Sequence, residues 1–314
     1  MGTRFGLVPP RIETPSALTI GSFDGVHRGH QVVIRNLREA ADALGGRAVW
    51  ITFDPHPRCV LDPANCPPQI TTLDERLEQV EHLGVDDAIV VEFTRELAGW
   101  PAEEFMRRVL ETVNLRRLVV GYDFALGRAR AGNLTWLREH GREHGYQVTV
   151  VAPVGAGPSG DEVHSSDVRR LLTLGEVRQA ALLLGRSYTL RGLVEQGDRI
   201  GRTIGFPTAN LALSPSKLVP ARGIYAGWAR DLTATPAVRH QAAISIGYRP
   251  TFGKTELRVE AFLLDFDGDL YEHRLELELV ARLRGEIKFE SVEALVQAMH
   301  RDVADTRQVL AESV

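Results

Sequence analysis

At positions 21–30 the chain reads Gly21-Ser-Phe-Asp-Gly-Val-His-Arg-Gly-His30, a glycine-rich turn between a strand-like and a helix-like segment. The apolar run 17–23 leads into the turn, and residues 30–44 carry apolar side chains at the 3.6-residue period of an amphipathic helix. Because strands that alternate with helices pair in parallel, this pattern predicts an α/β domain with helices on both faces of a parallel sheet. Further strand-like runs lie at 48–53, 88–93, 117–122 and 147–152.

The second half of the chain has a different pattern. Two short helices are predicted between residues 163 and 184, and short strands broken by glycine, proline and aspartate follow from 186 to 282. The run LELELV at 275–280 alternates apolar and charged residues, as a half-exposed antiparallel strand does. We expect a small antiparallel β-barrel, closed by an amphipathic C-terminal helix over residues 291–310.

The length of 314 residues favours two domains, and we place their boundary near Gly185, with one domain at 1–185 and the other at 186–314. A net charge of -4 leaves no basic surplus for a nucleic-acid backbone, so nucleic acid is not an expected partner. No stretch of about 18 consecutive apolar residues occurs, so we expect no signal peptide, no membrane partner and a cytoplasmic location. The sequence does not determine the oligomeric state.

Cys59 and Cys66, the two cysteines of the chain, have six residues between them. This spacing matches neither a paired zinc motif nor the framework of a secreted disulfide-rich protein, so we expect two reduced structural thiols. A zinc site that combines them with His56 and His82 is the alternative.

The turn at 21–30 has the chemistry of a phosphate site. Glycines let the backbone approach a phosphate closely, a helix N-terminus offers unpaired N–H groups, and His27 and His30 can donate to phosphate oxygens. This combination suits nucleotidyl transfer at an α-phosphate, which needs positioned donors and no protein nucleophile. Three more polar segments follow predicted strands: 53–57 (Phe-Asp-Pro-His-Pro), 121–133 and 165–169 (Ser-Ser-Asp-Val-Arg).

The segment 192–210, in the barrel half of the chain, is rich in glycine. The chain has no Walker A pattern, so ATP would need a loop of another design.

These motifs resemble known families. The HxGH motif with its preceding GxFDGVH resembles the nucleotidyltransferase superfamily, and more narrowly the adenylyltransferase module of prokaryotic bifunctional riboflavin kinase/FAD synthetases. The segment 201–210 (Gly-Arg-Thr-Ile-Gly-Phe-Pro-Thr-Ala-Asn) resembles the flavokinase signature, and family-like segments continue to Phe289. The resemblance implies a nucleotidyltransferase-like (Rossmann-like) domain followed by a kinase barrel. It also implies the use of ATP and Mg²⁺ to convert riboflavin to FMN, and FMN to FAD with release of pyrophosphate.

The same resemblance implies roles for individual residues. In the first module His27 and His30 would contact the ATP phosphates, and Arg169 with Ser165 and Ser166 would hold phosphate near the leaving group. The other nucleotide-binding positions would be Gly21, Phe23, Asp24, Gly25, Gly29, Asp54, His56, Pro57, Asp123, Phe124, Gly127 and Asn133. In the second module Glu260 would be the general base and Thr208 and Asn210 would lie at the phosphates and the magnesium. The other ATP- or flavin-binding positions would be Gly197, Gly201, Gly205, Pro207, Tyr225 and Arg284.

Two positions depart from the family pattern. Asp167 stands where the family usually has threonine, and a carboxylate near a polyphosphate is repulsive unless it faces a metal or points away. Leu126 stands where the family often has phenylalanine.

The sequence is also compatible with other hypotheses. Each histidine could be an ordinary core or surface residue, and Glu260 could face solvent on its strand. One module alone could be active, the nucleotide could be CTP, or the chain could be a flavin-binding regulatory protein.

Overall fold

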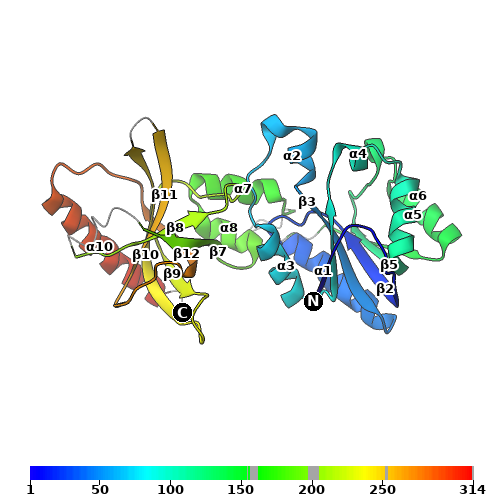
Figure 1. The fold of residues 1–314 in the computed structure, drawn as a ribbon, viewed down its shortest axis with the longest axis horizontal. Helices are drawn as coiled ribbons and strands as arrows, with labels where there is room; N and C mark the ends of the chain where they lie inside the picture. The colour runs from blue at the N-terminus through cyan, green and yellow to red at the C-terminus, as the bar shows by residue number, and fades with distance from the viewer. Residues whose placement is uncertain (154, 156–161, 197–204, 252–253, 313–314) are drawn as a thin grey trace. The chain divides into compact units, whose positions relative to one another are not determined.

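The computed structural model describes residues 1–153, 155, 162–196, 205–251 and 254–312. Its contacts divide the chain into two compact units, Met1–Ser165 and Ser166–Val314 (Figure 1). The first unit contains a parallel sheet with helices and the second contains a closed antiparallel barrel, so the predicted fold class is confirmed. Residues 166–184 group with the barrel, and the domain boundary near Gly185 stays a prediction.

A six-stranded parallel sheet in the order β1-β4-β3-β2-β5-β6 forms the centre of the first unit. Its strands are β1 (Gly2–Phe5), β2 (Ile12–Ile20), β3 (Arg47–Asp54), β4 (Asp87–Glu92), β5 (Val113–Gly121) and β6 (Gln147–Val151). From β2 the chain adds β3 and β4 on one side and β5 and β6 on the other, so the order reverses between β2 and β5. Ligands of open α/β sheets bind outside the carboxyl ends of the strands at such a reversal. The residues that follow β2 and β5 therefore flank the expected site.

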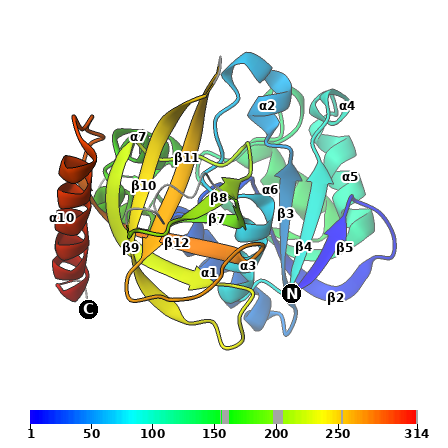
Figure 2. The ribbon, with the colours of Figure 1, turned by 60° about the vertical axis from the view of Figure 1, so that its left-hand side comes forward.

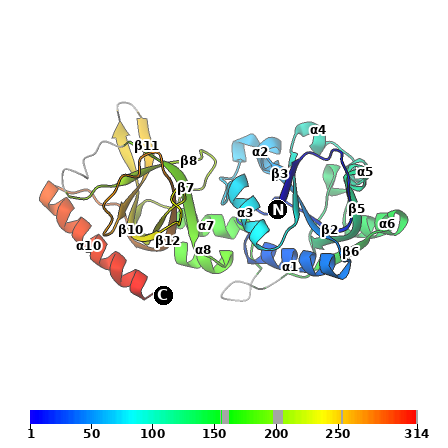
Figure 3. The same cartoon turned by 60° about the horizontal axis from the view of Figure 1, so that its bottom comes forward.

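Helices cover both faces of this sheet, and Figure 3 shows α1 and α5 on opposite sides of the strands. One face is covered by α1 (Arg28–Ala43) and α3 (Leu73–His82), and the other by α5 (Ala102–Thr112) and α6 (Leu134–His144). Neighbouring strand residues belong to different core clusters: Trp50 packs with α1, and Ile51 packs with α5 and α6. Both faces are apolar because both are buried. Short helical turns complete the unit: α2 (Pro57–Leu61), η1 (Pro63–Asn65), α4 (Arg95–Ala98) and η2 (Arg128–Arg130).

The second unit is a closed barrel in the order β10-β11-β8-β7-β12-β9. Its strands are β7 (Tyr188–Glu195), β8 (Ala209–Leu213), β9 (Gly223–Asp231), β10 (Arg239–Thr251), β11 (Lys254–Leu263) and β12 (Arg274–Arg284). Two helices precede the barrel, α7 (Ser165–Leu174) and α8 (Val177–Leu184). The last helix, α10 (Val292–Ala311), packs along β9 and β10 (Figure 2).

The alternating run 275–280 buries its leucines on one side of β12, as predicted, but a glutamate on the other side is also buried. Leu275, Leu277 and Leu279 are fully buried. Glu276, however, is also buried, because its carboxylate forms ion pairs with Arg191 and Arg230 of the neighbouring strands. Ionic pairing across strands thus allows a charged residue to be buried at a position where alternation alone predicts an exposed side chain.

The strands predicted in the first half are confirmed, with shifts at their ends. The run 17–23 ends as a strand at Ile20, because Phe23 and Val26 take positive φ angles of 46° and 41° that no strand allows. The short strand β1 was not predicted.

The expectation of two reduced thiols is wrong for this structure, and so is the zinc site that shared them. Cys59 and Cys66 form a disulfide, because α2 and η1 fold back and bring the two Cα atoms to 4.2 Å. Among the described residues no helix combines the length and the apolar character needed to cross a bilayer.

Candidate active sites

Residues 21–27, here called the histidine loop, leave the carboxyl end of β2 in a tight bend. The Val26 N–H donates to the Phe23 carbonyl at 3.0 Å, and Gly25 has a φ of 86°. Gly21 has no room for a side chain, because a Cβ there would lie 2.7 Å from the Phe23 ring. Positive φ at an aromatic and a β-branched residue is strained backbone, which persists only where surrounding contacts hold it.

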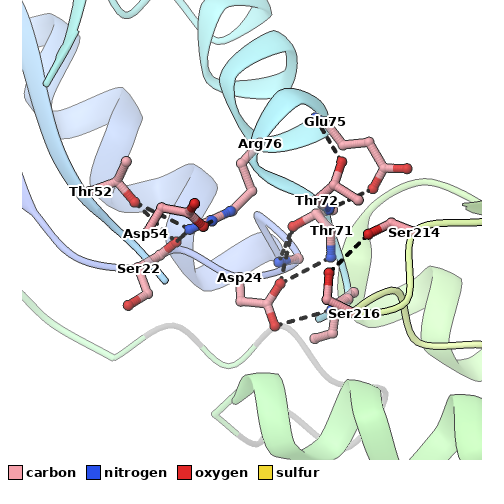
Figure 4. A network of polar contacts seen from close by, with 12 residues as sticks. Ser22, Asp24, Thr52, Asp54, Thr71, Thr72, Glu75, Arg76, Ser214 and Ser216 are labelled. Carbon is pink, nitrogen blue, oxygen red and sulfur yellow. Dashed lines mark hydrogen bonds and ion pairs between the residues drawn. The ribbon is translucent and has the colours of Figure 1, made fainter. Parts of the chain in front are cut away.

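Such contacts come from β3 and from the start of α3 (Figure 4). The Arg76 guanidinium donates to the Ser22 carbonyl at 2.7 Å, and the Trp50 indole N–H donates to the Gly21 carbonyl at 3.0 Å. The Asp24 carboxylate accepts the backbone N–H groups of Ile70 and Thr71 at 3.1 and 3.0 Å. The histidine loop is therefore fixed from both sides.

His27 and His30 lie side by side where the histidine loop enters α1. Their rings stack with centroids 3.7 Å apart, and the His30 ring also stacks on Phe23 at 4.5 Å. Burial, and then the neighbouring His27, hold the pKa of His30 well below its usual value of 6.5, so His30 is neutral near pH 7. Its Nδ1 is buried without a hydrogen-bond partner among the described residues. The side chain of His27, the N-cap residue, makes no capping hydrogen bond to the first turn of α1, where a helix leaves N–H groups without intrahelical partners.

The segment after β3 joins this network. One Asp54 carboxylate oxygen lies 3.6 Å from the Arg76 guanidinium. His56 is the N-cap of α2, where its Nδ1 accepts the Arg58 N–H at 3.1 Å, and Pro57 is the first residue of that helix. The Arg76 side chain thus connects the Asp54 carboxylate to the carbonyl of Ser22.

The segment after β5 forms a separate turn before α6. Asp123 is exposed, and its carbonyl accepts from Arg130 at 2.6 Å. The amide oxygen of Asn133 caps α6 by accepting the Trp136 N–H at 3.1 Å.

The apolar residues of the same segment belong to the core. Phe124 packs against the core, and a Cβ at Gly127 would lie 2.6 Å from the backbone nitrogen of Ala102. Leu126 is itself a core residue, so this departure exchanges one apolar core side chain for another.

The predicted phosphate-binding serines lie at the start of α7. The Ser165 hydroxyl donates to the Asp24 carbonyl at 2.9 Å, which brings Ser165 to the histidine loop. Ser166 and Arg169 belong to the second unit, and their phosphate contacts stay predictions.

A cavity of about 430 Å³, lined by strands of the barrel and by α10, collects several of the predicted kinase residues. Thr208, Asn210, Glu260 and Arg284 all line it, although they come from three strands and a preceding turn. Its apolar wall includes Phe206, Ile246, Phe262, Phe289 and Met299. A polar edge beside an apolar wall suits an aromatic ligand that carries a reactive hydroxyl.

Strand register explains why Asn210 and Glu260 meet. They are directly opposite residues of the antiparallel pair β8 and β11, so their side chains lie on the same face. The Asn210 amide oxygen is buried and has no hydrogen-bond partner among the described residues. A buried polar atom without a partner is costly unless a ligand or cation occupies it.

Arg284 is held by a residue of the C-terminal helix. Its guanidinium donates two parallel hydrogen bonds to the Asp302 carboxylate, at 2.8 and 2.6 Å, and lies over the Phe289 ring at 5.8 Å. Asp302 is buried and also lines the cavity. This bidentate pair attaches α10 to the rim of the site.

Of the remaining kinase positions, the three that the structure describes, Gly205, Pro207 and Tyr225, are not part of the cavity lining. Tyr225 is fully buried, and its hydroxyl donates to the Ala221 carbonyl; burial raises its pKa to about 12. Gly205, with a φ of 86°, and Pro207 are exposed in the turn before β8. Gly197 and Gly201 lie outside the described residues.

Arg76 and Asp302 are site residues that the sequence motifs did not indicate. Each is a charged residue on the apolar stripe of its helix, Arg76 between Leu73 and Val80, and Asp302 beside Met299. A charge on a buried stripe requires a partner, and this signal would have found both residues.

Two family models match the chain: FAD synthetase over residues 10–167 and riboflavin kinase over residues 184–310. The bifunctional riboflavin kinase/FMN adenylyltransferase of Listeria monocytogenes is 36% identical over 299 residues, which are 94% of this chain and 92% of that protein. The protein of the same description from Pseudomonas fluorescens is 36% identical over 298 residues, with 94% and 93% covered. A crystal structure described as a macrolide-efflux protein from Streptococcus pneumoniae matches with a TM-score of 0.88 and 29% identity, over 98% of this chain and 99% of that one.

Proposed function

Because the chain belongs to the family of bifunctional riboflavin kinase/FMN adenylyltransferases, we propose that its histidine loop transfers the adenylyl group and its barrel cavity houses the kinase reaction. The enzyme uses ATP to phosphorylate riboflavin to FMN and to adenylylate FMN to FAD. The observation that carries the kinase assignment is the pairing of Asn210 with Glu260 in the wall of one cavity.

In the kinase reaction, Glu260 takes the proton from the 5′-hydroxyl of riboflavin. The hydroxyl oxygen then attacks the γ-phosphorus of ATP, the bond to the bridging oxygen breaks, and ADP leaves. Phe206, Ile246 and Phe262 offer the apolar wall against which the flavin ring packs. General-base assistance of this kind contributes about 10²- to 10⁴-fold to a rate.

Thr208 and Asn210 would hold Mg²⁺ in this cavity. The buried, unpartnered amide oxygen of Asn210 supports this assignment, since Mg²⁺ prefers oxygen ligands and keeps most of its waters. When bound, the cation would neutralise charge on the phosphates.

In adenylyl transfer, a phosphate oxygen of FMN attacks the α-phosphorus of ATP and pyrophosphate leaves. His27 and His30 donate to the α-phosphate oxygens as charge develops there, helped by the N–H groups at the start of α1. A neutral His30 retains one N–H for this purpose. Arg76 and Asp24 act as positioning residues, because they hold the backbone of the histidine loop.

The location of the enzyme and its partners are part of the same proposal. We place the enzyme in the cytoplasm, as expected for an enzyme that uses ATP in both reactions. A net charge of -4 gives nucleic acid no role as a partner.

A time course of riboflavin conversion tests the assignment as a whole. Purified protein with Mg²⁺ and ATP is expected to form FMN first and FAD afterwards, as separated by liquid chromatography. With CTP in place of ATP we expect neither product at a comparable rate. Formation of FMN without FAD would remove the role of the histidine loop.

A further inference from the structure

Two histidines of α6 and a glutamate of α5 form a cluster that neither reaction uses. His140 and His144 are one helical turn apart, and their rings stack with centroids 3.9 Å apart. Glu103 faces them from α5, with a carboxylate oxygen 3.5 Å from His140 Nε2. One ligand atom from each of the three residues lies within 4.8 Å of the other two.

The hydrogen bonds of the two rings leave their Nε2 atoms for a ligand. His144 Nδ1 lies 2.9 Å from the His140 carbonyl, and because a carbonyl only accepts, Nδ1 carries the hydrogen and Nε2 keeps its lone pair. His140 Nδ1 lies 2.8 Å from the Tyr146 hydroxyl, which can accept the Nδ1–H in the same way. A histidine whose Nδ1–H is held by an oxygen is the usual form of a metal ligand.

His140 Nε2 is the second, independent indication. The side chain of His140 is buried, with 4% of the residue exposed, and its Nε2 makes no hydrogen bond within the described part of the chain. Trp136 stacks on the same ring at 4.6 Å, so the imidazole is held in place. A buried nitrogen that makes no hydrogen bond is costly unless an ion occupies the site.

We propose that Glu103, His140 and His144 bind a divalent transition-metal ion of the Zn²⁺ type. Two imidazoles with one carboxylate are a borderline-soft ligand set, which suits Zn²⁺ and not the Mg²⁺ used with ATP. Two ligands at about 2.0–2.2 Å from a tetrahedral ion lie roughly 3.5 Å apart, which matches the observed 3.5 Å between His140 Nε2 and Glu103. A water would complete the coordination.

The charged surroundings are compatible with a cation. Arg107 lines the adjoining pocket, but its guanidinium is already paired with Glu104 and Glu111.

The metal site lies apart from the adenylyl-transfer site. Asn133 caps the other end of α6, roughly 16 Å along the helix from His144 at 1.5 Å per residue. A bound ion would therefore connect α5 to α6 on one face of the sheet and stabilise the first unit without entering the reaction.

Zinc titration of the untagged, chelator-treated full-length protein by calorimetry tests the site, in buffer without nucleotide. We expect one Zn²⁺ per chain for the wild type and at least a tenfold weaker affinity for His144→Ala and for Glu103→Gln. His82→Ala is the matched control, because His82 is an exposed histidine at the end of α3 with its Nδ1 2.8 Å from the Glu78 carbonyl. Its affinity for zinc should equal that of the wild type.

Thermal unfolding provides a second readout that does not depend on activity. Zinc should raise the Tm of the wild type and of His82→Ala, and leave that of His144→Ala unchanged. The inference is overturned if the wild type shows no saturable binding, or if His144→Ala binds zinc as tightly as the wild type does. FAD formation by zinc-free His144→Ala should equal the wild-type rate, so this test is separate from that of the proposed function.

Discussion

Arg76 is a buried charge that contacts both the histidine loop and β3. Its guanidinium touches the carbonyl of Ser22 and the hydroxyl of Thr52, and forms an ion pair with Asp54. Burial lowers the pKa of Arg76, but the nearby carboxylates of Asp24 and Asp54 oppose this shift and the group remains a cation. The positive charge therefore connects α3 to two segments that are distant in sequence, the histidine loop and β3.

Replacing Arg76 should impair adenylyl transfer through the position of the histidines. We expect Arg76→Met to lower the kcat of FAD formation from FMN by about 10- to 100-fold, because a displacement of about 1 Å can cost that much. Arg76→Lys should recover part of the rate, since a lysine can still reach the Ser22 carbonyl. Steady-state assays of both reactions measure this, with riboflavin phosphorylation as the internal control.

The prediction for Arg76 fails in one clear case. If Arg76→Met unfolds at the wild-type temperature and keeps its adenylylation kcat within twofold, the guanidinium does not position the histidine loop. A lost kinase activity in the same variant would indicate general misfolding.

Candidate site residues can be proposed from sequence where a local motif contains them. His27, His30, Thr208, Asn210 and Glu260 stand within short motifs, and the structure brings the last three to one cavity. Arg76 and Asp302 could not be identified in that way, because each acts through a partner from a distant segment. Such pairing depends on tertiary packing, which a motif does not encode.

At the scale of elements, the junction of β2 and α1 makes the first unit sensitive to acid. The pKa of His30 in the folded chain lies well below the value of about 6.5 that an unfolded chain has, first through burial and then through His27. Below pH 6.5 the unfolded chain binds a proton that the folded chain does not. The contribution of His30 to stability should thus be constant above about pH 7 and fall as the pH drops from 6.5 toward the folded pKa.

Urea unfolding at pH 7.5 and pH 5.5 measures this dependence. We expect His30→Gln to lose less stability than the wild type over the same interval, since glutamine has no proton to gain. His140, whose pKa is also lowered, contributes equally to both proteins and cancels in the comparison. Identical losses in both proteins would show that His30 titrates alike in the folded and unfolded chains.

The attachment of α10 to the barrel depends on the pair of Arg284 and Asp302. Asp302→Ala leaves a cation at the cavity rim without its bidentate partner, and we expect a loss of roughly 2–4 kcal/mol from the free energy of unfolding. Chemical denaturation measures this loss, and Arg301→Ala, at an exposed position of the same helix, is the control. A loss below about 0.5 kcal/mol would mean that the pair adds nothing beyond a surface contact.

Elements with strong periodicity were predictable, and those fixed by long-range pairing were not. The helix predicted at 30–44 and the C-terminal helix at 291–310 agree with α1 and α10 within two residues. The strand β1 has four residues, mostly exposed, and exists because it pairs with β4 more than 80 residues later. The disulfide of Cys59 and Cys66 likewise depends on how α2 and η1 fold back.

At the scale of the whole molecule, one chain carries two catalytic sites on two unrelated architectures. The parallel sheet offers the carboxyl ends of β2 and β5, and the barrel offers a cavity lined by its strands and by α10. Sequence length, the change of pattern and the two motifs were enough to predict a parallel-sheet domain followed by an antiparallel barrel. The sequence pattern did not show that residues 166–184 group with the barrel, because this grouping rests on tertiary contacts.

The most direct measurement assays each half-reaction separately in two variants, His30→Ala and Glu260→Gln. His30→Ala should lose about 10²- to 10³-fold in FAD formation from FMN while it phosphorylates riboflavin at the wild-type rate. Glu260→Gln should lose about 10²- to 10⁴-fold in riboflavin phosphorylation while it adenylylates supplied FMN normally. If either variant loses both activities together, or keeps both within a few-fold, the two reactions do not reside at the two sites described.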